Sequence, residues 1–152
     1  MTRKILTLIA AGGSAALLAG AYIFQAMGYL PCAMCWWQRY PHFAAVAIGV
    51  IAFFVPVQAL LYLGALAAAV TAGIGIFHVG VEQKWWAGPA SCTSSGGLTG
   101  LTGGDLLALD GPKLILCDQI SWQMFNISMP GWNAIFSLIL VFVWLKAART
   151  PR

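Results

Sequence analysis

Long charge-free segments alternate with short polar ones along this chain. Ile5 to Met27 is a run of 23 residues without a charge, and the 42 residues from Tyr40 to Val81 form a second such run. About 20 consecutive apolar residues are enough for a helix to cross the hydrocarbon core of a bilayer. The first run therefore predicts a membrane span at 5–27, and the second run is long enough for two spans.

Pro56 and a C-terminal hydrophobic stretch complete the predicted set of helices. Proline ends or kinks a helix, so Pro56 divides the second run into spans at about 38–55 and 58–81. The last span is predicted at 131–146, and segment 82–130 before it contains all four acidic residues. The expected fold is an all-α membrane protein of one domain, a four-transmembrane-helix bundle with a long outer loop between its third and fourth helices.

The composition fits this reading. Only 8% of the residues are charged and 61% are hydrophobic, with a mean hydropathy of +0.84. A water-soluble domain has roughly a quarter of its residues charged, so this chain is expected to present its surface to a lipid bilayer. Its net charge of +4 does not indicate a nucleic-acid partner, because the basic residues do not cluster on an amphipathic element. The glycine-rich stretch 96–104 lacks the Lys-Ser/Thr of a phosphate-binding loop, and we interpret it as a flexible linker.

Basic residues at the two ends of the chain predict its orientation. Arg3 and Lys4 precede the first span, whereas Lys146, Arg149 and Arg152 follow the last one. The positive-inside rule then places both termini in the cytoplasm, as an even number of spans requires. The long loop and the short segment before the second span are therefore extracytoplasmic.

The first hydrophobic segment has an alternative interpretation as a cleaved signal peptide. The apolar region of a signal peptide has about 7–15 residues, and the run at 5–27 is longer. We therefore expect an uncleaved helix, and the sidedness of the remaining spans would be the same in either case.

Four cysteines carry the candidate chemistry, and all four are predicted on the side where disulfides persist. Cys32 and Cys35 form a Cys-x-x-Cys motif just before the second span, and Cys92 and Cys117 lie in the long loop. A Cys₄ zinc site usually has two Cys-x-x-Cys knuckles, which the second pair does not provide, so no metal is expected. Structural disulfides would suit the loop pair but not Cys-x-x-Cys, because closing so small a ring removes little chain entropy. A pair that cycles between dithiol and disulfide is favoured.

Arg39 strengthens the redox interpretation. It is the only basic residue within 5–83, and a charge at a membrane boundary is a functional-site candidate. One helical turn after Cys35, its guanidinium would favour a thiolate or donate to a carbonyl oxygen; the alternative is an interfacial arginine that snorkels to water. Pro41 suits only the first turn of a helix, so we expect the helix to begin no earlier than Gln38, with Cys35 just before it.

His78 and Glu82 are spaced one turn apart at the outer end of the third span. They could form an interfacial hydrogen-bonded pair. They could also handle protons or face a quinone, because histidine titrates near neutrality. His42, one turn into the second span, is weaker evidence of the same kind.

The joint placement of the four cysteines and Arg39 resembles the disulfide bond formation protein B (DsbB) family, in particular its shorter bacterial members. The resemblance covers nearly the whole chain. The matching segments are 30–39 (LPCAMCWWQR), 78–86 (HVGVEQKWW), 88–92 (GPASC), Cys117-Asp118 and 129–133 (MPGWN).

This resemblance implies a protein-disulfide:quinone oxidoreductase of the bacterial inner membrane. A periplasmic thioredoxin-fold oxidase (DsbA-like) would attack a Cys92–Cys117 disulfide at Cys92, and the electrons would pass to a Cys32–Cys35 disulfide. The resulting dithiol would reduce ubiquinone or menaquinone, with Cys35 as the thiolate at the ring.

The remaining site residues follow from the same resemblance. Arg39 would hold a quinone oxygen, and His78 and Glu82 would be possible further contacts. Two other functions stay open: a thiol–quinone enzyme of the vitamin K epoxide reductase type, whose Cys-x-x-Cys is expected near a late helix, and a membrane scaffold with structural disulfides.

Overall fold

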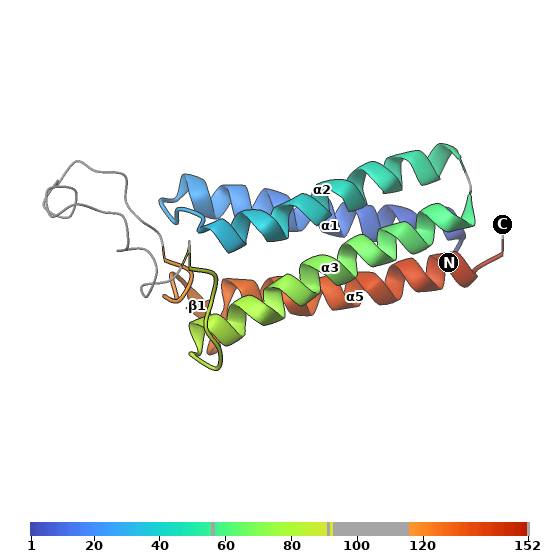
Figure 1. Cartoon of the computed structure of the whole chain (residues 1–152). Helices are drawn as coiled ribbons and strands as arrows, with labels where there is room; N and C mark the ends of the chain where they lie inside the picture. The colour runs from blue at the N-terminus through green and yellow to red at the C-terminus, as the bar shows by residue number, and fades with distance from the viewer. Residues whose placement is uncertain (56, 91, 93–115, 152) are drawn as a thin grey trace, which may run out of the picture.

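Four long helices run side by side and form one elongated bundle (Figure 1). The computed structural model describes residues 1–55, 57–90, 92 and 116–151. The elements are α1 (Arg3–Ala26), α2 (Ala33–Phe54), α3 (Gln58–Glu82), β1 (Gln123–Met124), β2 (Ile127–Ser128) and α5 (Met129–Arg149). Both termini lie at one end of the bundle, and the α1–α2 connection, the hairpin and the end of α3 lie at the other (Figure 1).

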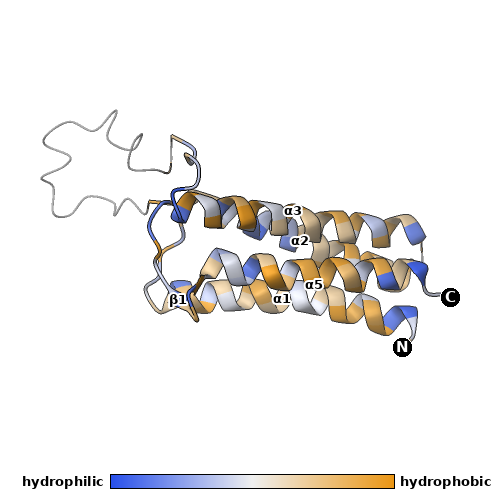
Figure 2. Cartoon of the chain, turned by 90° about the horizontal axis from the view of Figure 1, so that it is seen from below, coloured by the Kyte–Doolittle hydropathy of each residue, from blue (hydrophilic) through white to orange (hydrophobic). Residues whose placement is uncertain are grey.

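Three of the helices in the described part of the chain, α1, α3 and α5, are long and apolar enough to cross a membrane. They cover the spans predicted at 5–27, 58–81 and 131–146. Figure 2 shows hydrophobic residues along the middle of the bundle and hydrophilic ones gathered toward its ends. Large apolar side chains such as Phe54, Leu66 and Phe142 point outward and are more than half exposed, as expected of a surface in contact with lipid.

Small residues let the helices pack closely around Trp144, whose side chain is fully buried. A Cβ atom added at Gly64 of α3 would lie 2.7 Å from the Trp144 ring, so only glycine fits there. Gly49 of α2 allows the same close approach to Ala11 of α1. Small residues at helix interfaces are the usual means by which membrane helices gain packing contacts.

Helix α2 begins at Ala33, so our prediction of a start near Gln38 is wrong. The Cys32 sulfur accepts a hydrogen bond from the Cys35 backbone N–H at 3.3 Å and caps the first turn. Pro41 therefore lies inside the helix rather than in its first turn. Proline within a membrane helix is tolerated where neighbouring groups compensate for the missing N–H.

The segment between α3 and α5, predicted only as a loop, contains a small hairpin. β1 and β2 pair antiparallel through a turn at Phe125 and Asn126, both with positive φ (53° and 59°). Asparagine adopts this backbone region more readily than most residues, and two such residues form the tight turn that joins antiparallel strands. The glycine-rich stretch 96–104, predicted as a linker, lies outside the described residues.

Candidate thiol redox site

Cys32 and Cys35 lie together at the start of α2, with their sulfur atoms 3.0 Å apart. Both are free thiols; Cys32 is buried and Cys35 is partly buried. The Cys32 thiol donates to the Cys35 sulfur, and this hydrogen bond and burial raise the pKa of Cys32. Of the two thiols, Cys32 is therefore the harder one to deprotonate.

Cys92 and Cys117 form a disulfide that packs directly against this pair. Both are buried, in one cluster with Cys32. Next to Cys117, the carboxylate of Asp118 accepts a 2.8 Å hydrogen bond from Lys84, which follows α3. The two pairs belong to different connections at the same end of the bundle, one between α1 and α2 and one between α3 and α5, and the packing of the helices brings them together.

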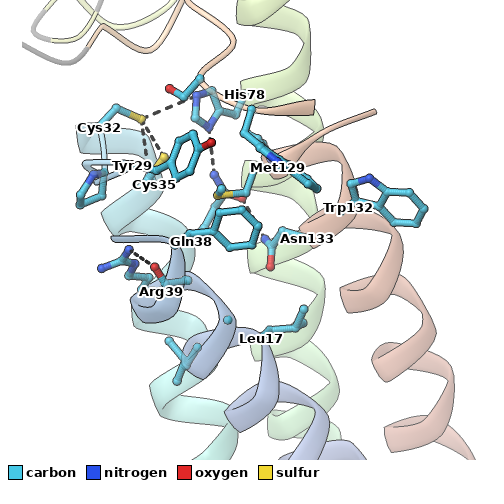
Figure 3. A pocket seen from close by; sticks show the side chains of 18 of the residues that line it. Leu17, Tyr29, Cys32, Cys35, Gln38, Arg39, His78, Met129, Trp132 and Asn133 are labelled. Carbon is cyan, nitrogen blue, oxygen red and sulfur yellow. Dashed lines mark hydrogen bonds between the residues drawn. The ribbon is translucent and has the colours of Figure 1, made fainter. Parts of the chain in front are cut away.

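A cavity of about 490 Å³ opens beside Cys35, between the helices and the hairpin (Figure 3). Most of its wall is apolar, from residues such as Leu17, Phe24 and Met129. Its polar side chains include Gln38, Arg39, His42, His78, Glu82 and Asn133. Small-molecule sites usually have this character, a largely apolar cleft of about 300–1,000 Å³ with a few converging polar groups.

Arg39 lines the cavity one turn after Cys35, now within the same helix. Its guanidinium donates to Gln25 Oε1 at 2.7 Å and to the Ala21 carbonyl at 3.2 Å. It also stacks between two aromatic rings, with centroid distances of 4.6 Å to Tyr22 and 4.7 Å to Trp36. The charge is thus held in place from four sides rather than snorkelling to water.

His78 and Glu82, at the outer end of α3, are both buried and both line the cavity. His78 makes its contacts with α2: Nε2 lies 3.7 Å from Cys32 Sγ, and Nδ1 lies 3.0 Å from Gln38 Nε2. The imidazole of His78 is therefore oriented by these contacts and not by a hydrogen bond to Glu82.

A buried polar network beneath the thiols escaped the sequence analysis. Asn133 of α5 donates to Gln38 Oε1 at 2.9 Å and to Thr71 Oγ1 at 3.2 Å. Thr71 donates in turn to the Gln38 carbonyl, and His42 contacts Asn133 Oδ1 at 2.9 Å. The available signal was the presence of single polar residues inside otherwise apolar helices, which in a membrane must find partners.

Cys32, Cys35 and His78 offer one ligand atom each within 4.8 Å of one another. Two sulfurs and an imidazole nitrogen suit a soft cation, but a closed structural zinc site has four ligands. The disulfide keeps Cys92 and Cys117 from contributing, so the described cysteines do not form the Cys₄ site considered from the sequence.

In the described part of the chain, three membrane-capable helices and a thiol pair beside a cavity define a multi-pass membrane protein with a thiol redox centre. The chain belongs to the DsbB family: residues 3–147 match the family model described as "Disulfide bond formation protein DsbB". It is therefore a membrane oxidoreductase of disulfide bond formation, which confirms the predicted family and class of enzyme.

Curated relatives support the assignment across the whole chain. Disulfide bond formation protein B of Marinobacter nauticus is 31% identical over 86% of this chain and 83% of the relative. The protein of the same name from Verminephrobacter eiseniae is 27% identical over 99% of this chain and 90% of the relative. No solved structure matches the chain significantly.

Proposed function

We propose that this enzyme takes electrons from a soluble thioredoxin-fold dithiol oxidase (DsbA-like) and delivers them to a membrane quinone, ubiquinone or menaquinone. The observation that carries the proposal is the cavity of about 490 Å³, because it reaches both the Cys35 thiol and the Arg39 guanidinium. A flat, largely apolar ligand with polar oxygens matches such a lining. The quinone would accept two electrons and two protons there.

Arg39, His78 and Glu82 are the residues we assign to the quinone end of the reaction. The guanidinium of Arg39 has five N–H donors, and Gln25 and the Ala21 carbonyl each accept one. The remaining donors are available to hold a quinone oxygen near Cys35. His78 and Glu82 complete the polar wall of the same cavity.

The Cys92–Cys117 disulfide is proposed as the entry point for electrons. A thiolate of the soluble partner attacks Cys92, which releases Cys117 as a thiolate. Cys117 then attacks Cys32 of the oxidised pair and releases Cys35 as a thiolate beside the cavity. The burial of Cys32 in one cluster with both loop cysteines supports this order; Cys35, which packs against the same cluster, is only partly buried.

We also propose four membrane spans, with α2 as the fourth, and both termini in the cytoplasm of a bacterial inner membrane. Gln38, Arg39 and His42 lower the hydropathy of α2, yet its 22 residues are close to the 24 of α1 and the 25 of α3. Lys4 lies in the first turn of α1 and Lys146 in the last turn of α5, and the termini mark this end of the bundle (Figure 1). The positive-inside rule assigns that end to the cytoplasm.

The test is quinone reduction by the purified protein, followed by quinone absorbance, with a reduced thioredoxin-fold oxidase as electron donor. Wild type should transfer electrons, and Cys32→Ser should not. Cys92→Ser should block the protein donor but leave reduction by dithiothreitol, because the inner pair and cavity are intact. A protein that reduces no quinone, or a Cys32→Ser variant with full transfer, would refute the proposal; a structural scaffold would show the first result.

A further inference from the structure

The side-chain amide of Gln38 has only one possible orientation in the buried network. Its Nε2 lies 3.3 Å from the Met34 carbonyl oxygen, which can only accept a hydrogen bond. The amide nitrogen therefore faces Met34 and His78, and the amide oxygen faces Nδ2 of Asn133 at 2.9 Å. A backbone carbonyl thus resolves the usual ambiguity between amide nitrogen and oxygen.

This orientation also decides which nitrogen of His78 carries the proton. Gln38 Nε2 can only donate, so His78 Nδ1, at 3.0 Å, must be the acceptor. In a neutral imidazole the other nitrogen is then protonated. The Nε2–H consequently faces Cys32 Sγ, which lies 3.7 Å from Nε2 (Figure 3), and the Cys117 backbone is a second acceptor for the same N–H.

We propose that His78 is a catalytic residue of the exchange between the two cysteine pairs, and that its Nε2–H donates to the Cys32 sulfur and stabilises it as a leaving thiolate. The inference deepens the proposed function, on which the exchange step rests. It gives His78 a role toward sulfur, in addition to its place in the cavity wall. The Cys35 backbone N–H, 3.3 Å from Cys32 Sγ, is a second donor to the same atom.

His78 would act in the step that restores the Cys92–Cys117 disulfide. Once the second thiol of the soluble partner has displaced Cys92 from their mixed disulfide, the Cys92 thiolate attacks Cys117 in a Cys32–Cys117 disulfide; the Cys92–Cys117 bond forms and the Cys32–Cys117 bond breaks. The electron pair leaves on Cys32, one disulfide replaces another, and the total charge is unchanged. Because Cys32 is only 5% exposed, the leaving thiolate needs protein donors in place of water.

Two nearly isosteric substitutions separate the donor role from a merely structural one. The side-chain nitrogen of glutamine reaches the position of histidine Nε2, whereas that of asparagine reaches only the position of Nδ1. His78→Gln therefore keeps a donor toward Cys32, and His78→Asn keeps only a contact with Gln38. His78→Ala serves as a second variant without the donor, in case His78→Asn does not fold.

The measurement uses the full chain with Cys35, Cys92 and Cys117 replaced by alanine, so that Cys32 is the only thiol. Its alkylation by iodoacetamide is followed against pH, and the midpoint reports thiolate stability independently of how easily the reagent enters. His78→Asn and His78→Ala should weaken ionisation about tenfold and raise the midpoint by about one pH unit. His78→Gln should stay within about threefold of the parent.

Equal midpoints for His78→Asn and the parent, or equal shifts for His78→Asn and His78→Gln, would overturn the inference. The assay contains no quinone and no protein partner, so its outcome is separate from that of the proposed function. An enzyme that fails to reduce quinone can still show the His78 effect. If the enzyme reduces quinone but the alkylation midpoint of Cys32 does not depend on His78, only the role of His78 is refuted.

Discussion

Replacing Arg39 by lysine keeps the positive charge beside Cys35 but should weaken quinone binding. The guanidinium uses one donor for Gln25, at 2.7 Å, and one for the Ala21 carbonyl, at 3.2 Å. Of its five N–H donors, three remain for a ligand in the cavity. The ammonium group of lysine has three N–H donors in all. Because the lysine side chain is shorter than that of arginine, we expect its ammonium to stay near Gln25 rather than reach a ligand in the cavity.

The size of the effect follows from the contacts that lysine loses. A hydrogen bond from a charged donor contributes about 1.5–3 kcal/mol, so losing the bond to the quinone oxygen corresponds to roughly a 10- to 100-fold weaker affinity. Stacking between the Tyr22 and Trp36 rings, at 4.6 and 4.7 Å, also favours a planar guanidinium over an ammonium. We therefore expect the KM for quinone to rise about tenfold or more.

Steady-state quinone reduction at varied quinone concentration measures this change. Because the charge that stabilises the Cys35 thiolate remains, kcat at saturating quinone should fall less than about threefold. Gln25→Leu is the matched control: Arg39 stays and loses one tether, so the KM should rise in the same direction by a smaller factor. An unchanged KM in both Arg39→Lys and Arg39→Met would show that Arg39 only anchors α2 at the interface.

Two further predictions concern packing and thiol reactivity. Gly64→Ala should destabilise the solubilised bundle by about 1–3 kcal/mol, because its Cβ would lie 2.7 Å from the Trp144 ring, whereas Gly73→Ala has open space around it; thermal unfolding in detergent compares the two, and equal melting temperatures would contradict this packing. Because the pKa of Cys32 is raised, Cys32 stays protonated as the pH passes the ordinary thiol range, so brief alkylation of the reduced enzyme near neutral pH should label Cys35 first. Mass spectrometry of the peptides measures the order, and Cys32 should become reactive only at higher pH.

Hydropathy and charge were sufficient to predict most of the fold. The charge-free runs correspond to α1, α3 and α5 because a span needs little more than length and apolar composition. The predicted start of α2 was wrong because we allowed Pro41 only in the first turn of a helix. That rule holds for isolated helices, where nothing replaces the hydrogen bond that proline removes. The capping of the first turn by Cys32 depends on sulfur geometry that no pattern of hydrophobicity records.

The site was predictable in its reactive residues but not in their arrangement. Spacing identified Cys32 and Cys35 as a redox pair, and the isolated charge of Arg39 marked it as functional. The partners that orient these groups are ordinary residues, such as Gln25 on α1 and Gln38 on α2. Their role arises only when separate helices pack together, so no local pattern in the sequence could reveal it.

The early start of α2 fixes where the two sulfurs of the Cys32–Cys35 pair lie. Had the helix begun near Gln38, the link between Cys32 and Cys35 would be an irregular segment free to present either thiol. With Cys32 as the N-cap and Cys35 in the first turn, the two sulfurs instead have fixed and different surroundings. Cys32 is buried in one cluster with the loop disulfide, whereas Cys35 is only partly buried against that cluster and lies one helical turn before Arg39; both cysteines line the cavity. In the proposed reaction Cys32 would therefore receive the electrons from the loop pair, and Cys35, one helical turn before Arg39, would pass them to the quinone.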